Sequence, residues 1–324
     1  MLEGDAMNTV SVNAEAACLE APVREGAEPS DARRAARMPS SVNYHLWEPC
    51  NMRCRFCFAT FQDVVAEVLP RGHLARSESN RLVAELAPHF QKITFAGGEP
   101  TLCPWLGDLI HDAKQLGMTT MVVTNGSRLA SMDLGALAGD LDWIALSIDS
   151  VSPATHVQLG RAVRGKALST AHYVALGERI RSAGIRLKLN TVVTSLNVDE
   201  DLHALVAALQ PERWKILRVL PIDGQNSGSV EPLLCSEQAF RGFVARHRRV
   251  EDDGITLAPE DNDDMRGSYA MIDPAGRFFD DVDGRHHYSE PILSAGLARA
   301  WSQVRFSEER FDRRGGNYDF KRPR

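Results

Sequence analysis

The sequence predicts an α/β fold built as a partial (βα)6 barrel, TIM-like but incomplete, and two observations lead to this fold class. Short β-branched apolar runs alternate with helix-length segments from Ser41 to Leu220. Polar or glycine-rich motifs follow these runs at the places where strands would end. Such alternation is typical of parallel strands joined by right-handed helical crossovers. Six units favour a partial barrel over a closed eight-fold one, and an open doubly wound sheet remains the alternative.

The expected strands have the apolar, β-branched character of strands buried on both faces. They cover residues 41–47, 92–95, 118–124, 141–147, 185–193 and 214–220. The segments between them have helical length and composition, and the expected helices cover residues 77–87, 105–116, 129–139 (a shorter stretch), 170–183 and 199–209.

The alternation stops after Leu220, and this change divides the chain. A helix is expected at 237–249 and a hairpin at 267–279, because Asp273-Pro-Ala-Gly276 is a turn sequence. We therefore expect three parts: a disordered leader (1–40), the partial barrel (41–220), and a C-terminal extension (221–324) that closes the barrel mouth and completes the substrate pocket.

Composition excludes some classes of protein. The 324 residues are 44% hydrophobic and 25% charged, as in ordinary globular proteins. A net charge of −6 argues against direct nucleic-acid binding, which needs a basic face. No apolar run approaches the roughly 20 residues of a membrane span, and the first forty residues lack the apolar centre of a signal peptide. We expect a cytoplasmic protein with no membrane contact.

Three cysteines, Cys50, Cys54 and Cys57, lie in one short loop with C-x3-C-x2-C spacing directly after the first expected strand. A structural zinc site would need four ligands, and no fourth cysteine or histidine is nearby. A disulfide would need an oxidising compartment. The spacing therefore favours an iron–sulfur cluster held by three thiolates with one open iron. Cys103 and Cys235 are isolated and are expected to be packing residues.

Further candidate residues follow the later strands. In parallel α/β folds ligands bind at the carboxyl ends of the strands. Gly97-Gly-Glu-Pro100 follows the second expected strand, Thr124-Asn-Gly-Ser127 the third, and Ser147 ends the fourth. Each alone fits a plain turn or a core hydroxyl, but one barrel rim would gather them around one small molecule. Lys188 and Asn190 share one face of the fifth strand because they are two residues apart.

The cysteine motif, with Phe56 before its last cysteine, and the Gly-Gly-Glu-Pro motif resemble the radical S-adenosylmethionine (SAM) superfamily. The resemblance implies a [4Fe–4S] cluster and SAM as cofactors, with SAM cleaved to methionine and a 5′-deoxyadenosyl radical. It implies Cys50, Cys54 and Cys57 as cluster ligands. The residues implied to hold SAM are Gly97, Gly98, Glu99, Pro100, Asn125, Ser127, Ser147 and Arg161.

A narrower resemblance extends from about residue 41 to residue 318. Four motifs are similar to those of the viperin family: Ser41-Val-Asn-Tyr-His45, Glu212-Arg-Trp-Lys215, Ser268-Tyr269 and Arg314-Gly-Gly-Asn-Tyr318. The leader does not resemble the membrane helix of animal viperins, so a soluble prokaryotic-type member is expected. The resemblance implies a dehydratase that converts a nucleoside triphosphate to its chain-terminating 3′-deoxy-3′,4′-didehydro form for antiviral defence. CTP is the expected substrate, or UTP or GTP, and the electron donor a ferredoxin or flavodoxin.

A triphosphate carries about four negative charges and needs several converging cationic donors. The residues that match viperin positions for this role are Lys92, Lys188, Asn190, Arg213, Lys215 and Arg314. Lys188 and Lys215 also interrupt strands otherwise suited to burial, where an unpaired ammonium group is costly. Tyr269 matches the viperin tyrosine placed to protonate the leaving hydroxyl. The alternative is that Tyr269 only packs the C-terminal extension against the barrel.

Two other functions remain open. A different radical SAM enzyme, such as a peptide or cofactor maturase, would usually carry further C-terminal cysteines, and here only Cys235 is available. A non-catalytic metal-binding regulator would not need Lys188, Lys215 or Arg314. Two departures from animal viperins bear on ligand contacts: Ala96 replaces a serine, and the loop 160–166 is two residues longer.

Overall fold

The computed structural model describes residues 37–320, so most of the expected leader (1–40) lies outside the described residues. One sheet of ten strands has the order β10-β9-β8-β1-β2-β3-β4-β5-β6-β7. Its strands are β1 (Ser41–Trp47), β2 (Lys92–Gly97), β3 (Thr119–Thr124), β4 (Trp143–Ser147), β5 (Arg186–Val193), β6 (Arg213–Arg218), β7 (Thr256–Glu260), β8 (Ala270–Ile272), β9 (Arg277–Asp280) and β10 (His287–Pro291).

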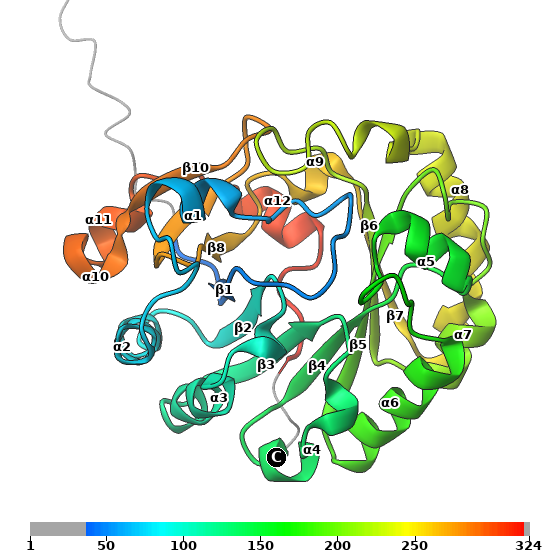
Figure 1. Cartoon of the computed structure of the whole chain (residues 1–324), viewed down its shortest axis with the longest axis horizontal. Coiled ribbons are helices and arrows are strands. Elements are labelled where there is room, and N and C mark those ends of the chain that lie inside the picture. The colour runs from blue at the N-terminus through cyan, green and yellow to red at the C-terminus, as the bar shows by residue number, and fades with distance from the viewer. Residues whose placement is uncertain (1–36, 321–324) are drawn as a thin grey trace, which may run out of the picture. The chain divides into compact units, whose positions relative to one another are not determined.

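The strands β1 to β7 are parallel and follow one another in chain order across the sheet. This order confirms the (βα) barrel interpretation, because a doubly wound sheet would reverse its strand order at a switch point. The barrel is incomplete: β7 and β10 are the two edges of the sheet and do not pair with each other. Figure 1 shows the parallel strands forming a curved inner layer with helices around its outside.

The outer helices lie between successive strands in the chain, as expected. They are α2 (Arg76–Leu86), α3 (Leu106–Gln115), α4 (Leu134–Leu137), α6 (Thr170–Ser182), α7 (His203–Leu209) and α8 (Glu237–His247). Two differ from the sequence prediction. The segment 129–139 splits into a 3-10 turn and α4, because Asp133 caps the amide of Ala136 and starts a new helix. α7 begins four residues later than expected, at His203, whose amide donates to the carboxylate of Asp201.

The C-terminal extension adds strands to both sides of the parallel strands. β7 pairs with β6, while β8 pairs in parallel with β1 on the opposite side of the sheet. The expected hairpin is present as β8 and β9, and its turn depends on Asp273, which accepts amide hydrogen bonds from Ala275 and Arg277. The short helices α1 (Gln62–Glu67), α5 (Pro153–Leu159), α9 (Asn262–Met265), α10 (Ile292–Ala295), α11 (Leu297–Trp301) and α12 (Glu308–Arg313) were not foreseen.

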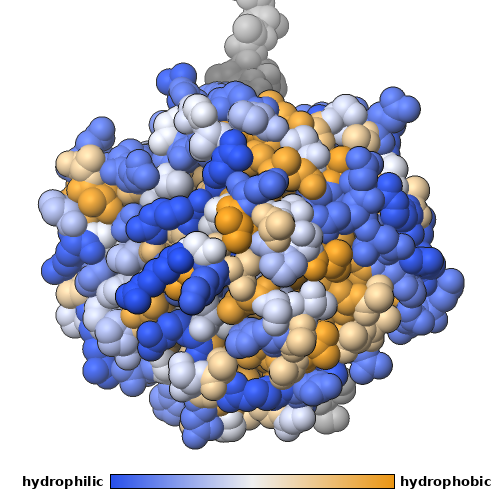
Figure 2. Space-filling view, turned by 45° about the vertical axis from the view of Figure 1, so that its right-hand side comes forward, coloured by the Kyte–Doolittle hydropathy of each residue, from blue (hydrophilic) through white to orange (hydrophobic). Residues whose placement is uncertain are grey.

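The main hydrophobic core lies between the strands and the outer helices, and it includes fully buried Trp214 and Tyr44. Cys103 and Cys235 belong to it, as expected for packing residues. Exposed large hydrophobic side chains are scattered, and Figure 2 shows hydrophobic patches among hydrophilic side chains on one face. Within residues 37–320, no helix combines the length and the apolar character that crossing a membrane requires.

Candidate active site

A cavity of about 630 Å³ lies among the strands and is partly lined by the extension. The predicted residues that line it are Cys50, Cys54, Cys57, Lys92, Gly97, Gly98, Glu99, Asn125, Ser147, Arg161, Lys188, Asn190, Lys215, Tyr269 and Arg314. Pro100, Ser127 and Arg213 were predicted at the site but are not among its lining residues. Segments from the beginning and the end of the described residues 37–320 therefore meet at one cavity.

The three cysteines are half-buried at the cavity, and their thiols are suited to a cluster. Burial raises the pKa of Cys54 to about 12 and also raises the pKa of Cys50 and of Cys57. Metal coordination removes such thiol protons. No three His, Cys, Asp or Glu side chains of residues 37–320 are grouped closely enough to bind a single metal ion. A [4Fe–4S] cluster takes one thiolate per iron, so three cysteine ligands would leave one iron open.

Glycines let the backbone approach the cysteine loop from two sides. A Cβ atom on Gly98 would lie 2.0 Å from the carbonyl oxygen of Glu48, and one on Gly160 would lie 1.9 Å from that of Arg53. The amide of Glu99 donates to the carbonyl of Pro49 (3.0 Å), and the amide of Arg53 donates to that of Gly160 (3.1 Å). Only glycine fits such close contacts. The end of β2 and the end of α5 thus fix the segment that carries the thiols.

The Glu99 carboxylate is used within the protein. It accepts hydrogen bonds from the hydroxyl of Thr124 (2.7 Å), the amide of Asn125 (2.8 Å) and the amide of Thr101 (3.1 Å). These bonds tie the end of β2 to the end of β3. Both oxygens of the Glu99 carboxylate therefore already have hydrogen-bond donors within the protein.

Asn125 and Ser127 brace the cysteine loop. The side-chain amide of Asn125 donates to Asn51 (2.9 Å), whose own amide donates to the Ser127 hydroxyl (2.8 Å). Arg161 forms a buried ion pair with Asp149 and lies over the ring of Phe56, 5.4 Å from its centre. These contacts fix the cysteine loop to the ends of the strands that surround the cavity.

One part of the cavity is strongly cationic. Burial, together with neighbouring cations, lowers the pKa of Lys92 and of Lys188 to about 7. Burial and the nearby Arg314 and Arg213 also lower the pKa of Lys215 to about 8, against the opposing effect of Glu260. Positive groups that repel one another in a buried site are stabilised when an anion binds. Arg213, at the start of β6, has its guanidinium group 4.5 Å from the centre of the Tyr318 ring.

Tyr269 lies in a buried charged network that the sequence did not reveal. Its hydroxyl donates to Glu260 and also accepts a hydrogen bond from Lys215. Lys215 forms an ion pair with Glu260 (2.8 Å), and the Arg314 guanidinium lies 3.6 Å from the centre of the Tyr269 ring. Burial and Glu260 raise the pKa of Tyr269 well above 10, so its hydroxyl keeps its proton at neutral pH. Glu260 was missed because β7, which ends at this residue, was not predicted.

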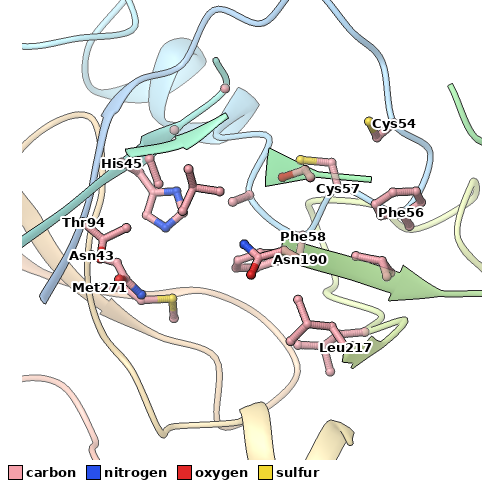
Figure 3. A pocket seen from close by; sticks show the side chains of 18 of the residues that line it. Asn43, His45, Cys54, Phe56, Cys57, Phe58, Thr94, Asn190, Leu217 and Met271 are labelled. Carbon is pink, nitrogen blue, oxygen red and sulfur yellow. The ribbon is translucent and has the colours of Figure 1, made fainter. Parts of the chain in front are cut away.

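Polar side chains from β1 and β2 face the same cavity. Figure 3 shows Asn43, His45 and Thr94 on one side of it and Cys54 and Cys57 on the other. The Nδ1 atom of His45 and the Oδ1 atom of Asn190 are buried without a hydrogen-bond partner among residues 37–320. Asn43 and His45 belong to the motif Ser41-Val-Asn-Tyr-His45, and because both line the cavity they are further candidate site residues.

Comparisons with known proteins agree with this geometry. The family model described as "Radical SAM superfamily" matches residues 46–209. A Flammeovirga pacifica protein is 48% identical over 282 residues, which are 87% of this chain and 96% of that protein. A Lacinutrix mariniflava protein is 49% identical over 282 residues, or 86% of this chain, and this chain spans 58% of its length. Both are named "S-adenosylmethionine-dependent nucleotide dehydratase".

Solved structures show the same fold at low sequence identity. Streptococcus suis SuiB bound to S-adenosylmethionine has a TM-score of 0.58 and 14% identity, covering 75% of this chain and 60% of its own. The enzyme anSMEcpe with bound AdoMet and a peptide has a TM-score of 0.56 and 14% identity, covering 74% and 73%. These likenesses concern the fold alone.

The fold, the three-thiol loop and the family match define a member of the radical SAM superfamily, with a [4Fe–4S] cluster and SAM as its cofactors. Within that superfamily, the chain belongs to the family of SAM-dependent nucleotide dehydratases, the viperins. The family resemblance and the cofactors predicted from the sequence are therefore confirmed. The residues that fit the cluster are Cys50, Cys54 and Cys57.

Proposed function

We propose that this protein is a radical SAM dehydratase that converts a nucleoside triphosphate, CTP first among the candidates, to its 3′-deoxy-3′,4′-didehydro form. When bound, the cluster and SAM supply the radical that removes a hydrogen atom from the ribose. The chain's own residues bind the triphosphate, exclude water and provide a proton for the hydroxyl that leaves. Antiviral defence would follow from a product that terminates RNA chains.

The observation that carries this proposal is the group of buried cations in the same cavity as the thiols. Lys92 and Lys188 have no acidic ion-pair partner within residues 37–320, and Lys215 and Arg314 share the single carboxylate of Glu260. Charged groups buried in this way are unfavourable unless a ligand compensates them. A triphosphate supplies about four negative charges and suits cationic donors that converge from several strands.

Tyr269 is proposed as the proton donor. Its protonated hydroxyl is buried at the cavity and hydrogen-bonded to Glu260, so a proton is available where a hydroxyl departs. The neighbouring Lys215 can replace the lost proton through the same network. Gly97, Gly98, Ser147 and Arg161 are proposed to hold SAM beside the thiols, and Asn190 lies between the two ends of the site in Figure 3.

The test uses the full chain, reconstituted with iron and sulfide without oxygen. It is incubated with SAM, a reductant and CTP, UTP or GTP in turn. The proposal expects one nucleotide to stimulate formation of 5′-deoxyadenosine and to lose one molecule of water. A maturase would instead cleave SAM slowly, at the same rate with each nucleotide. If none of the three nucleotides is dehydrated, the proposal is contradicted.

A further inference from the structure

We propose that the surface outside the cysteine loop is the docking site for an acidic one-electron donor protein. This inference rests on the proposed function, because radical chemistry with SAM requires an electron from outside. The donor is oxidised by one electron, which passes to the cluster, and no bond or proton changes in that step. The surface is formed by the cysteine loop, the end of α5 and the loop that follows it.

A second cavity, of about 500 Å³, opens on this surface. Its lining includes Cys50, Arg53, Val157, Gly160, Val163 and Arg164. Cys50 and Arg53 line this outer cavity and the active-site cavity alike, so the two cavities adjoin at the cysteine loop. Electron transfer weakens steeply with distance, and a partner seated here would approach the thiol site closely.

The surface is basic although the whole chain is acidic. Arg53 and Arg164 line the outer cavity, Arg55 lies in the same cysteine loop, and Lys166 pairs with Val163 beside it. No Asp or Glu is among the residues that line this cavity. The net charge of the chain is −6, so a local positive surface is a specific feature. Electrostatic complementarity then favours an acidic partner and raises its association rate.

The loop after Arg161 holds two of these cations in a fixed position. Val163 and Lys166 exchange backbone hydrogen bonds of 3.0 Å in both directions, which closes a two-residue hairpin turn. Arg164 and Gly165 form the turn with φ values of 50° and 76°. Positive φ at both positions is the type I′ pattern, which normally favours Asn or Gly over Arg. The Arg164 side chain is exposed and has no ion pair within residues 37–320. It is therefore available for contact with a partner protein.

An apolar side chain lies within this basic surface. Val157 of α5 is 46% exposed and also lines the outer cavity. Protein interfaces combine an apolar centre with a polar rim, and short-lived electron-transfer complexes use small contact areas. The end of α5 is also tied to the cysteine loop, because the amide of Arg55 donates to the carbonyl of Leu159 (2.9 Å). A donor bound here would contact both the end of α5 and the cysteine loop.

The test compares a protein donor with a small-molecule reductant. Flavodoxin, an acidic one-electron flavoprotein, is the probe, and the rate of 5′-deoxyadenosine formation is measured against its concentration. The double variant R164E/K166E should raise the KM for flavodoxin about tenfold and weaken its salt dependence. The rate with dithionite should stay within about twofold of the unmodified protein, since a small reductant needs no docking surface.

The matched control is R76E/R81E, which reverses two exposed charges on α2 and should leave the KM for flavodoxin unchanged. Binding of oxidised flavodoxin, measured by calorimetry without SAM or nucleotide, should weaken about tenfold in R164E/K166E only. Unchanged flavodoxin binding, or an equal loss of rate with dithionite, would overturn the proposal. If no nucleotide is dehydrated but flavodoxin-driven SAM cleavage still depends on Arg164 and Lys166, the proposed function fails and the docking surface stands.

Discussion

Lys188 lies in the middle of β5 with its ammonium group buried, a placement unfavourable for folding of the ligand-free protein. Its pKa falls from 10.5 to about 7, because burial disfavours the charged form. A lysine whose folded pKa is depressed destabilises the folded state below that pKa, and the effect fades as pH rises toward the unfolded value.

Replacing Lys188 with methionine should therefore separate stability from function. We expect K188M to increase the free energy of unfolding at pH 7 by about 1–2 kcal/mol, with a smaller gain at higher pH. The same variant should lose nucleoside triphosphate binding. Thermal melting and calorimetry measure the two effects, and a less stable variant that still binds CTP would argue against an anion site.

Tyr269 and Glu260 should affect turnover more than binding. Y269F removes the hydroxyl and should lower product formation about 100-fold, while SAM cleavage continues without product. E260Q keeps the shape of Glu260 but removes the charge that orients Tyr269 and Lys215. We expect E260Q to lower kcat while the nucleotide binds equally or more tightly, since a negative charge has left the site. Steady-state kinetics with CTP check both, and an unchanged kcat in Y269F would exclude this donor.

Gly98 should tolerate no side chain. A Cβ atom there would lie 2.0 Å from the carbonyl of Glu48 and 2.6 Å from that of Pro49. G98A should shift the segment before the thiols and reduce both iron content and SAM binding after reconstitution. G242A in α8 is the matched control, because nothing lies within 4 Å of its added Cβ. That helical change should stabilise the protein by about 0.5–1 kcal/mol.

At the scale of elements, the segment 314–318, which we call the C-terminal arm, contacts several of the cationic side chains at the cavity. The ammonium group of Lys92 donates to the Tyr318 hydroxyl (2.8 Å), and the Tyr318 ring lies near Lys188 and Arg213 at 5.9 and 4.5 Å. The Arg213 guanidinium also donates to the carbonyl of Gly315 (3.1 Å). The arm therefore positions the side chains that would meet the phosphates.

Removing the Tyr318 ring should loosen this arrangement. We expect Y318A to raise the KM for the nucleotide about tenfold with little change in kcat, because cation–π contacts and one hydrogen bond are lost together. Y318F keeps the ring, so its KM for the nucleotide should lie between that of the unmodified protein and that of Y318A. The measurement is the dependence of product formation on CTP concentration, and a Y318A variant with an unchanged KM would show that the arm has no such role.

The elements differ in how far the sequence predicts them. The strands β1 to β6 and most outer helices were predicted, because burial on both faces leaves a local apolar pattern. The cysteine loop was predicted for a similar reason, since its three thiols lie within eight residues. Glu260 could not be assigned to the site: it meets Tyr269 only after β7 and β8 join opposite sides of the sheet. The short helices of the extension have too few residues to show a period.

At the scale of the whole molecule, nucleotide affinity should depend on pH. The lysines with a pKa of about 7 or 8 lose protons as the pH rises from about 7 to 9, so the free protein loses positive charge. Bound phosphates favour the charged lysines, and binding takes up protons. We expect the affinity for CTP to fall about tenfold or more between these pH values.

Calorimetry in buffers of different ionisation enthalpy measures this proton uptake directly. The matched comparison is K188M. Because this variant lacks one titrating lysine, its proton uptake on nucleotide binding should be smaller. Constant affinity between about pH 7 and 9 would mean that the lysines stay charged in the free protein.

β1, which leads into the cysteine loop, lies in mid-sheet between β2 and β8. During synthesis β1 leaves the ribosome early, whereas its neighbour β8 is made more than two hundred residues later. Until then one edge of β1 has no partner strand, and the cavity lacks the lining that Ala270 and Met271 of β8 provide. Iron is therefore expected to enter only after synthesis has passed β8, so stalled or truncated chains should stay free of iron.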